Sequence, residues 1–277
     1  MKAPAPLGAA LGELPSIGLD ELLACAMLQT RVDRKYVLPA DALTALLTRV
    51  PADTRVLEID GERRFAYRSL YFDTPDLVSY RLTAHRRRRR FKVRTRVYEQ
   101  SDECWLEVKT RGSRDNTVKA RLPYAPDDHD TLVPGRRFVD TTLARNRIDG
   151  SHRFTFVPTL ATRYHRATLY LPGTNSRVTI DTGLMWQDGD RELRLPHMAV
   201  VETKTGSTAS PVDRLLWQNK YRPSRISKYA TGLAALRPYL PATPWRRTLR
   251  RDFQEVTSGA DDAYPPAMEL SGACAFG

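Results

Sequence analysis

The sequence predicts an α+β protein built on an eight-stranded antiparallel β-barrel with flanking helices. About eight segments have the length and the two-residue alternation of β-strands, and about eight strands is the usual number for a small closed barrel. At least five of these segments carry charged residues at alternate positions. No internal repeat of fixed period is visible in the 277 residues, so we expect a single barrel rather than a repeat array.

The clearest alternation lies in two consecutive segments at the centre of the chain. Lys92, Arg94 and Arg96 fall on one face of the first strand, and the apolar residues between them fall on the other. Glu107 and Lys109 share a face of the next strand in the same way. In an ordinary half-buried sheet the charged face is the solvated one. We expect instead that the charged face lines the inside of the barrel.

The composition favours a polyanionic partner and argues against several other classes. The 44 basic and 32 acidic residues give a net charge of +12, which suits phosphorylated ligands, nucleic acid or an anionic membrane. Cys25, Cys104 and Cys274 are too far apart for a disulfide framework or a metal motif, and the five histidines form no ligand pattern. No apolar run is long enough for a membrane span or a signal peptide, so we expect a cytoplasmic protein.

The remaining elements follow from alternation, capping residues and turns. We expect strands at 31–38, 56–59, 67–72, 91–98, 104–110, 117–124, 156–171, 176–186 and 193–205. We expect helices at 18–28, 41–47, 76–83, 210–221 and 229–240, and an external helical region within 125–151.

Antiparallel pairing of these strands would gather the alternating basic residues on one surface, together with Glu107 and Glu202. This surface would contain Lys35, Lys92, Arg94, Arg96, Lys109, Lys119, Arg121, Arg166 and Arg177. So many like charges repel one another in a low dielectric, and a linear phosphate chain would relieve that repulsion. The two carboxylates suit a hard divalent cation that bridges phosphate oxygens.

Nine ordered motifs between about residues 20 and 240 resemble the VTC domain, the polyphosphate-polymerase branch of the triphosphate tunnel metalloenzymes. They are Arg31-Val-Asp-Arg-Lys-Tyr, Ser69-Leu-Tyr-Phe-Asp-Thr, Phe91-Lys-Val-Arg-Thr-Arg-Val-Tyr, Leu106-Glu-Val-Lys, Thr117-Val-Lys-Ala-Arg, Arg163-Tyr-His-Arg, Arg177-Val-Thr-Ile-Asp, Val201-Glu-Thr-Lys and Ser227-Lys-Tyr. The resemblance implies a tunnel domain at 18–240. Composition predicts a flexible N-terminus at 1–17, which is rich in Ala, Pro and Gly, and a disordered tail at 241–277, which is polar and contains Pro and Gly.

The resemblance also implies an activity: transfer of the γ-phosphate of ATP to a growing polyphosphate chain, assisted by Mn²⁺ or, less preferred, Mg²⁺. The implied catalytic residues are Lys35, Arg94, Arg96, Lys109, Arg166 and Arg177. The predicted substrate-binding residues are Lys92, Lys119, Arg121, Tyr164, Lys204 and Lys228. The resemblance implies Glu202 as the main metal ligand, and Glu107 as a second candidate either for metal binding or for orienting Lys109. We expect ATP and polyphosphate as partners and no nucleic acid; a membrane-protein partner at the inner face of the membrane stays open.

One departure from the wider superfamily bears on the reaction. Tunnel hydrolases usually begin with Glu-x-Glu-x-Lys, and here the first position is Arg31, followed by Asp33 and Lys35. This favours the polymerase over a triphosphatase that hydrolyses tripolyphosphate or a nucleoside triphosphate. A non-catalytic module that binds polyphosphate or nucleic acid is the third hypothesis.

Simpler interpretations stand beside the functional ones. Arg86–Arg90 fits a solvated charge run, and Glu202 fits a salt bridge to Lys204. Tyr164 fits barrel packing and Lys228 fits a surface lysine. We interpret a further set of aromatic residues as core without a function, namely Tyr67, Tyr71, Phe72, Trp105 and Trp217.

Overall fold

A computed structural model describes residues 7–25, 32–111 and 117–253 of the chain. Several predictions fall outside these residues: the first six positions, the end of the 18–28 helix, Arg31, the loop at 112–116, Cys274 and the tail from residue 254.

The described strands form one 11-stranded sheet. Its main path runs in the order β2-β11-β9-β8-β4-β5-β6-β7, and every neighbouring pair along it is antiparallel. The bounds of these strands are β2 Val32–Pro39, β4 Phe65–Asp73, β5 Phe91–Tyr98, β6 Glu103–Arg111, β7 Thr117–Tyr124, β8 Val157–Leu171, β9 Ser176–Asp188 and β11 Met198–Thr205. Three short strands pair beside this path: β1 Ser16–Ile17, β3 Arg55–Leu57 and β10 Arg191–Leu195. The predicted eight-stranded antiparallel architecture with flanking helices is confirmed.

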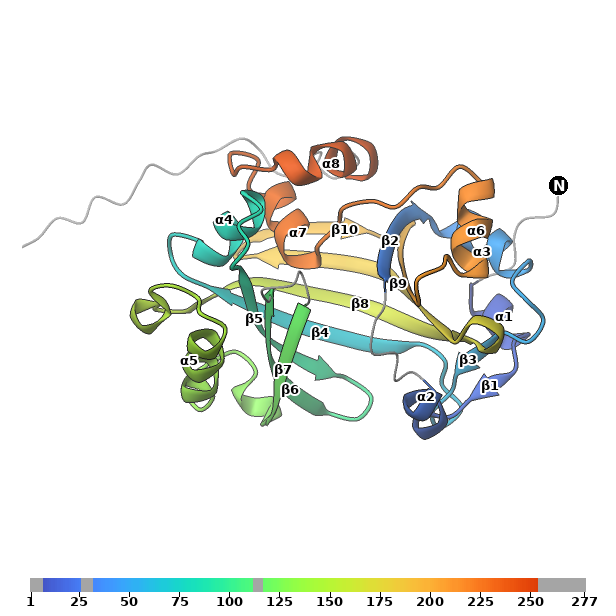
Figure 1. The fold of residues 1–277 in the computed structure, drawn as a ribbon, viewed down its shortest axis with the longest axis horizontal. Coiled ribbons are helices and arrows are strands. Elements are labelled where there is room, and N and C mark those ends of the chain that lie inside the picture. Colours follow the sequence, from blue (N-terminus) through green and yellow to red (C-terminus); the bar gives the residue numbers. More distant parts are fainter. Residues whose placement is uncertain (1–6, 26–31, 112–116, 254–277) are drawn as a thin grey trace, which may run out of the picture.

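The sheet curls strongly, and β5, β6 and β7 cross the direction of the long strands β4 and β8 (Figure 1). Its two terminal strands, β2 and β7, are not paired with each other in the described part of the chain. The predicted closed barrel is therefore corrected to a tunnel-like sheet with an open seam. Part of the edge of β2 at this seam is capped by a loop, since the Ser224 amide donates to the Lys35 carbonyl at 2.7 Å.

The helices pack around the sheet, with α3, α5 and α6 on its convex side (Figure 1). Their bounds are α1 Leu7–Gly12, α2 Leu19–Cys25, α3 Ala40–Leu47, α4 Val78–Ala84, α5 Arg136–Arg145, α6 Pro211–Gln218, α7 Lys228–Leu236 and α8 Arg246–Asp252. The predicted region 125–151 is helical only in part, because α5 is flanked by two short 3₁₀ turns.

Alternation explains which side chains the helices cover. Phe91, Val93 and Val97 of β5 point to the convex face and pack under Val139 and Leu143 of α5. Burial of these residues stabilises the fold by roughly 1.5–3 kcal/mol for each large side chain. The charged residues between them are thereby turned to the concave face, as the sequence predicted.

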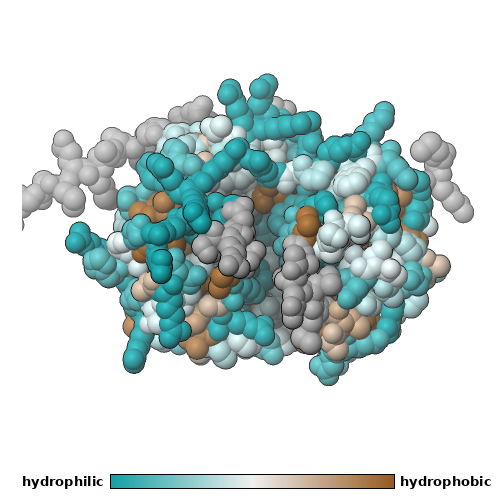
Figure 2. Space-filling view, in the orientation of Figure 1, coloured by the Kyte–Doolittle hydropathy of each residue, from teal (hydrophilic) through white to brown (hydrophobic). Residues whose placement is uncertain are grey.

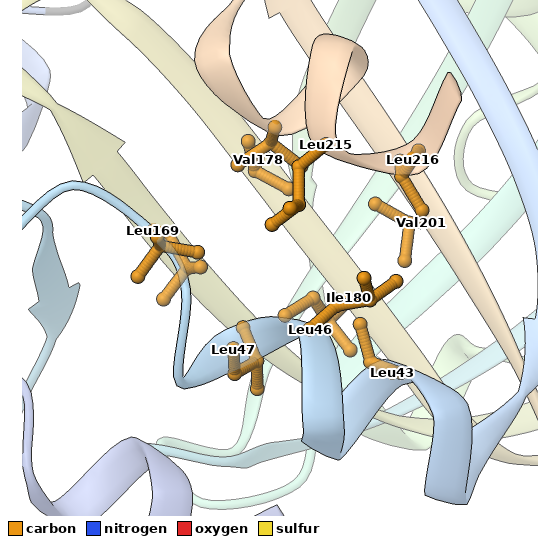
Figure 3. A pocket seen from close by; sticks show the side chains of 11 residues that line it. Leu43, Leu46, Leu47, Leu169, Val178, Ile180, Val201, Leu215 and Leu216 are labelled. Carbon is orange, nitrogen blue, oxygen red and sulfur yellow. The ribbon is translucent and has the colours of Figure 1, made fainter. Parts of the chain in front are cut away.

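Alternation also places the apolar residues of β9 and β11 on the convex face, where α3 and α6 cover them. Figure 3 shows leucines of α3 and α6 meeting Val178, Ile180 and Val201 on the convex face of β9 and β11. The small pocket there is lined by aliphatic side chains alone and belongs to the core. Helix α6 is held to the sheet by the buried Asp213, which closes a capping box with Ser210 and accepts a hydrogen bond from the Tyr36 hydroxyl at 2.7 Å.

Helix α7 lies against apolar residues of the concave face, and α4 and α8 pack around it. Tyr229 and Leu233 of α7 are buried with Tyr71, Tyr164 and Trp186 in one cluster. The helix therefore fills one end of the tunnel and leaves the charged end to the strands. The Tyr229 hydroxyl also donates to the buried Asp73, which accepts three backbone amides at the start of α4.

Close packing of α7 gives a first prediction. A Cβ on Gly232 would overlap the Trp186 indole ring, which is 1 % exposed. We expect Gly232→Ala to lower the free energy of unfolding by about 1–3 kcal/mol, because overpacking outweighs the gain in helix propensity. Equilibrium urea unfolding measures it, with Gly206→Ala as control, since a Cβ there meets nothing within 4 Å. Equal stability of the two variants would contradict this packing.

Both ends of the chain are more ordered than the sequence predicted. Residues 7–17, expected to be flexible, form α1 and β1, and Leu11 and Ile17 are each 1 % exposed. Residues 241–253, expected to be disordered, contain α8, and Trp245 and Phe253 join the core around α7. In both segments a few apolar side chains pack against strands or helices that are distant in the sequence.

Smaller differences concern boundaries. The strand expected at 193–205 is two strands, β10 and β11, separated at Pro196 and His197. Strand β5 begins only at Phe91, so Arg86–Arg90 lie in the turn after α4. Among the described residues, no helix is long and apolar enough to cross a membrane.

Candidate phosphate-binding tunnel

The concave face of the sheet carries cations from almost every strand of the main path. On β5 the three basic residues Lys92, Arg94 and Arg96 lie in sequence along the strand, and Lys109 of β6 stands opposite Lys92 in register. On β11, Lys204 stands opposite Arg177 of β9. The remaining predicted cations are Lys35 on β2, Lys119 and Arg121 on β7, Arg166 on β8 and Lys228 at the start of α7.

Glu107 is the centre of the first charged cluster. It is 3 % exposed, and Arg94 donates to its Oε2 through Nε and Nη2 at 2.8 and 2.5 Å. Lys119 pairs with the other carboxylate oxygen. Burial alone would raise the pKa of Glu107, but Arg94, Arg96 and Lys119 outweigh it and hold this pKa well below its usual range. Glu107 is therefore ionised and orients Arg94; the structure pairs it with Arg94 and Lys119, and the expected orientation of Lys109 stays a prediction.

Glu202 is the centre of a second cluster. Its Oε1 lies 3.1 Å from the Nζ of Lys35 and 3.1 Å from the Nζ of Lys204. Burial raises the pKa of Glu202, and the surrounding Lys35, Lys204 and Arg166 lower it by more, so that it also lies below its usual range. The predicted salt bridge to Lys204 is thus present, and Lys35 shares it.

A third cluster was not predicted as a site, and its centre is Asp181 on β9. Arg166 donates to both carboxylate oxygens of Asp181 at 2.6 and 2.9 Å, and Lys228 of α7 pairs with Oδ2. Asp181 is 1 % exposed, and although burial raises its pKa, Arg166 and Lys228 bring the pKa down to about 2. The signal was available in the sequence, because Asp181 has the same strand parity as the predicted Arg177.

Aromatic rings lie between the clusters. Tyr67 and Tyr164 stack with centroids 5.3 Å apart, and the Arg166 guanidinium lies 5.3 Å from the Tyr67 centroid and 5.4 Å from that of Tyr164. Arg96 donates to the Tyr164 hydroxyl at 3.1 Å, and Arg94 donates to the Tyr71 hydroxyl at 2.8 Å. Tyr67 and Tyr71 belong to the core cluster, as the sequence predicted, and both rings also contact arginines of the concave face.

Electrostatic interactions across the tunnel indicate that the cations surround a common space. Burial, followed by repulsion from Lys109, Arg94 and Lys35, lowers the pKa of Lys92 to about 7. Burial and Arg94 lower the pKa of Lys109 to about 8, although Glu202 opposes the change. Lys109 on β6 and Glu202 on β11 lie near opposite ends of the strand path, so their interaction requires the sheet to curl around them.

The start of helix α7 contacts two different strands of the charged concave face, β5 and β9. The Nζ of Lys92 on β5 donates to the Ser227 hydroxyl at 2.6 Å, while Lys228 pairs with Asp181 on β9. The Lys228 ammonium also lies 4.3 Å from the Tyr164 ring centroid. Lys228 is therefore no ordinary surface lysine, and Tyr164 is part of the charged wall as well as of the packing.

Three of the predicted cations are exposed, namely Lys109, Lys119 and Arg121. Arg121 stacks on Trp105, with its guanidinium 4.5 Å from the ring centroid. The Lys119 side chain is 39 % exposed although it pairs with Glu107. The other predicted cations are brought together, while the roles assigned to the individual residues stay predictions.

The carboxylates define what kind of metal site is possible. In the described part of the chain, no group of three or more His, Cys, Asp or Glu side chains could hold a metal ion. Glu107, Asp181 and Glu202 belong to three separate clusters, and each is neutralised by two cations. These residues do not fit a cage made by the protein alone. They fit a hard cation that arrives with phosphate oxygens and takes one carboxylate from the protein.

Comparison with known proteins agrees with this geometry. A family model for the VTC domain matches residues 30–237, which include every strand and cluster of the tunnel. No curated protein matches the chain. The chain belongs to the VTC domain family, which confirms the resemblance drawn from its motifs.

Solved structures of similar overall arrangement are distant in sequence. A proposed adenylyl cyclase from Hippeastrum, which has a dominant triphosphatase activity, is 17 % identical with a TM-score of 0.46, covering 77 % of this chain and 99 % of that one. A proposed adenylate cyclase from Bacillus halodurans is 12 % identical with a TM-score of 0.47, covering 71 % and 93 %. A Pyrococcus horikoshii protein is 12 % identical with a TM-score of 0.40, covering 74 % and 98 %.

Proposed function

We propose that this protein is a polyphosphate polymerase, which transfers the γ-phosphate of ATP to a growing polyphosphate chain inside its tunnel. The observation that carries the proposal is the number of cations on the concave face beyond those that neutralise Glu107, Asp181 and Glu202. Burial is the main cause of the lowered pKa values of Lys92 and Lys109, and repulsion from neighbouring cations, Lys35 on β2 among them, adds to it. A chain of phosphates would remove that repulsion along the whole row.

Membership in the VTC domain family supports the same reaction. Each of the three carboxylates on the concave face is held between two cations and is therefore not free to attack as a nucleophile. The reaction needs none. A terminal oxygen of the acceptor polyphosphate can attack the γ-phosphorus in line, forming one P–O bond while the bond to the β-phosphate oxygen breaks and ADP leaves.

The protein would then act through position and charge. Arg94, Arg96 and Arg166 are held by hydrogen bonds to carboxylates and tyrosine hydroxyls, so their guanidinium groups are oriented before a phosphate arrives. Such pre-orientation stabilises charge on the transferring phosphoryl group without reorganisation during the reaction.

A divalent cation would enter with the nucleotide, and we propose Mn²⁺ as preferred and Mg²⁺ as a substitute. When bound, such an ion neutralises phosphate oxygens. Glu202 is the proposed protein ligand because it lies in the enclosed space near Lys109, whereas Glu107 is engaged by the bidentate contact from Arg94. The cytoplasmic location and a membrane-protein partner also stay predictions.

The test of this function is an elongation assay with the purified full chain, ATP, MnCl₂ and a short polyphosphate primer. We expect longer polymer and an equal amount of ADP. Orthophosphate release without polymer would favour the triphosphatase, and binding without turnover would favour a non-catalytic module. Either outcome would contradict the polymerase.

The lowered lysine pKa values give a second prediction, on proton uptake. Phosphate raises the pKa of Lys92 from about 7, so binding of tripolyphosphate at pH 8.5 should protonate this side chain. Affinity should therefore fall as pH rises above 7, by at most about tenfold per pH unit for this lysine. Calorimetry in buffers of different ionisation enthalpy measures the protons taken up.

Lys92→Arg is the matched control, because arginine keeps its charge throughout this range. It should take up fewer protons than the parent, and the protons that tripolyphosphate itself exchanges cancel in the difference. Identical proton numbers in the two proteins would contradict the position of Lys92 beside the phosphate chain.

A further inference from the structure

The helix that follows the VTC match, α8, is strongly basic and belongs to the ordered fold. Its sequence is Arg-Arg-Thr-Leu-Arg-Arg-Asp, and Arg246, Arg247, Arg250 and Arg251 are all exposed. Thr248 is 5 % exposed and faces the protein, so the arginines point outwards. Asp252 is the one acidic residue of the helix, and it pairs with Arg251. The helix therefore presents several cations that it does not neutralise itself.

Helix α8 is joined to the tunnel through the segment at 222–227. The Arg251 guanidinium donates to the Ser224 hydroxyl at 3.1 Å, and the Thr248 hydroxyl donates to the Arg225 carbonyl at 3.3 Å. The other side of this segment contacts the phosphate site, because the Ser224 amide binds the carbonyl of Lys35 on β2. Three residues further on, the Ser227 hydroxyl accepts from Lys92.

Further exposed arginines lie in the segments next to these contacts. Arg222 and Arg225 are exposed on the connecting segment, and the turn of Arg86–Arg90 precedes Lys92 on β5. Arg90 is close enough to Lys92 to lower its pKa, after burial and the tunnel cations. Figure 2 shows long hydrophilic side chains gathered over α8 and beside it over α4 and the start of β5.

We propose that α8 and the segment at 222–225 form an external binding surface for polyphosphate that extends beyond the tunnel. This deepens the proposed function and rests on it. The occupant is polyphosphate because the segment at 222–225 contacts β2 at Lys35 on one side and α8 on the other, so a phosphate chain held in the tunnel can extend onto the arginines outside it. A flat anionic lipid surface cannot enter the tunnel, and single-stranded nucleic acid, which is also a linear polyanion, is separated from polyphosphate by the binding test.

A length-dependent binding experiment tests this surface. The full chain carries Arg246→Ser, Arg247→Ser and Arg250→Ser together, and its affinity is measured for tripolyphosphate and for a long-chain polyphosphate. We expect about a tenfold or greater loss for the long chain and less than a twofold change for tripolyphosphate. The slope of log affinity against log salt for the long chain should also become shallower by about 2, at roughly 0.7 per lost contact on a single-stranded polyanion.

A matched control removes the same charge elsewhere. Arg49, Arg137 and Arg145 are exposed and lie at α3 and α5, so their triple serine variant should keep long-chain affinity within about twofold. Equal losses in the two triple variants would overturn the proposal, because net charge alone would then explain binding. Loss of tripolyphosphate binding in the α8 variant would also overturn it.

Two further measurements distinguish failure of the external surface from failure of the proposed function. If the parent binds tripolyphosphate but holds a long chain no more tightly, the external surface is wrong and the tunnel stands. If the parent binds neither, the proposed function itself fails. An α8 variant that loses binding to phosphatidylserine vesicles or single-stranded DNA, yet keeps long-chain polyphosphate, would assign the surface to that partner and overturn the proposal.

Discussion

Replacing Arg166 by alanine is expected to lower polyphosphate elongation at least about a thousandfold, the scale of a positioned arginine in phosphoryl transfer. Arg166 is held by the two hydrogen bonds to Asp181 and lies over the rings of Tyr67 and Tyr164, so no other side chain can take its position. Elongation of a labelled primer at saturating ATP measures the loss.

Two companion variants separate charge from geometry. Arg166→Lys keeps the charge but loses the bidentate contact, so it should recover part of the activity and not all of it. Arg163→Ala removes an exposed arginine from the same strand, where the side chain does not face the clusters, and should stay within about threefold of the parent. An Arg166→Ala protein that melts like the parent and elongates as fast would contradict a catalytic tunnel.

Glu202→Gln should raise the metal concentration for half-maximal elongation by about 10- to 100-fold, the range that changes around a metal site typically cause. Glutamine keeps the shape of the side chain and removes the charge that Lys35 and Lys204 now share. The measurement is a titration of MnCl₂ in the elongation assay at fixed ATP and primer, with free metal held by a buffer.

The control for this change is Glu192→Gln on β10, which removes a carboxylate paired with Arg194 away from the clusters. Its metal response should match that of the parent. Should Glu202→Gln instead bind polyphosphate more tightly with an unchanged metal response, Glu202 would act only to neutralise lysines. A non-catalytic binding module would predict that same indifference to the substitution.

Much of the tunnel could be predicted from the sequence because side-chain parity is a local property. Because Phe91, Val93 and Val97 pack under α5 on the convex face, the residues that alternate with them must face the concave side of the sheet. The same holds for Glu202 and Lys204, which alternate with residues packed under α3 and α6. The set of cations on the concave face followed from this alternation alone.

The Asp181 cluster, the open seam and helix α8 depend on contacts between segments that are distant in the sequence, so the local sequence pattern did not predict them. The partnership of Arg166 with Asp181 and Lys228 joins β8, β9 and α7, and only the fold shows that these meet. The open seam between β2 and β7 could not be predicted either, since strand count is the same for open and closed sheets. Helix α8 was missed because its short apolar side gains stability only by packing on the core around α7.

The most direct measurement is a crystal structure of the full chain with tripolyphosphate. We expect contiguous phosphate density inside the curl of the sheet, within hydrogen-bond distance of Arg94, Arg96 and Arg166, with the Lys92 side chain turned towards the phosphate chain. Phosphates found only on the outer surface, with the three carboxylate clusters undisturbed and no density between the walls at saturating ligand, would contradict it.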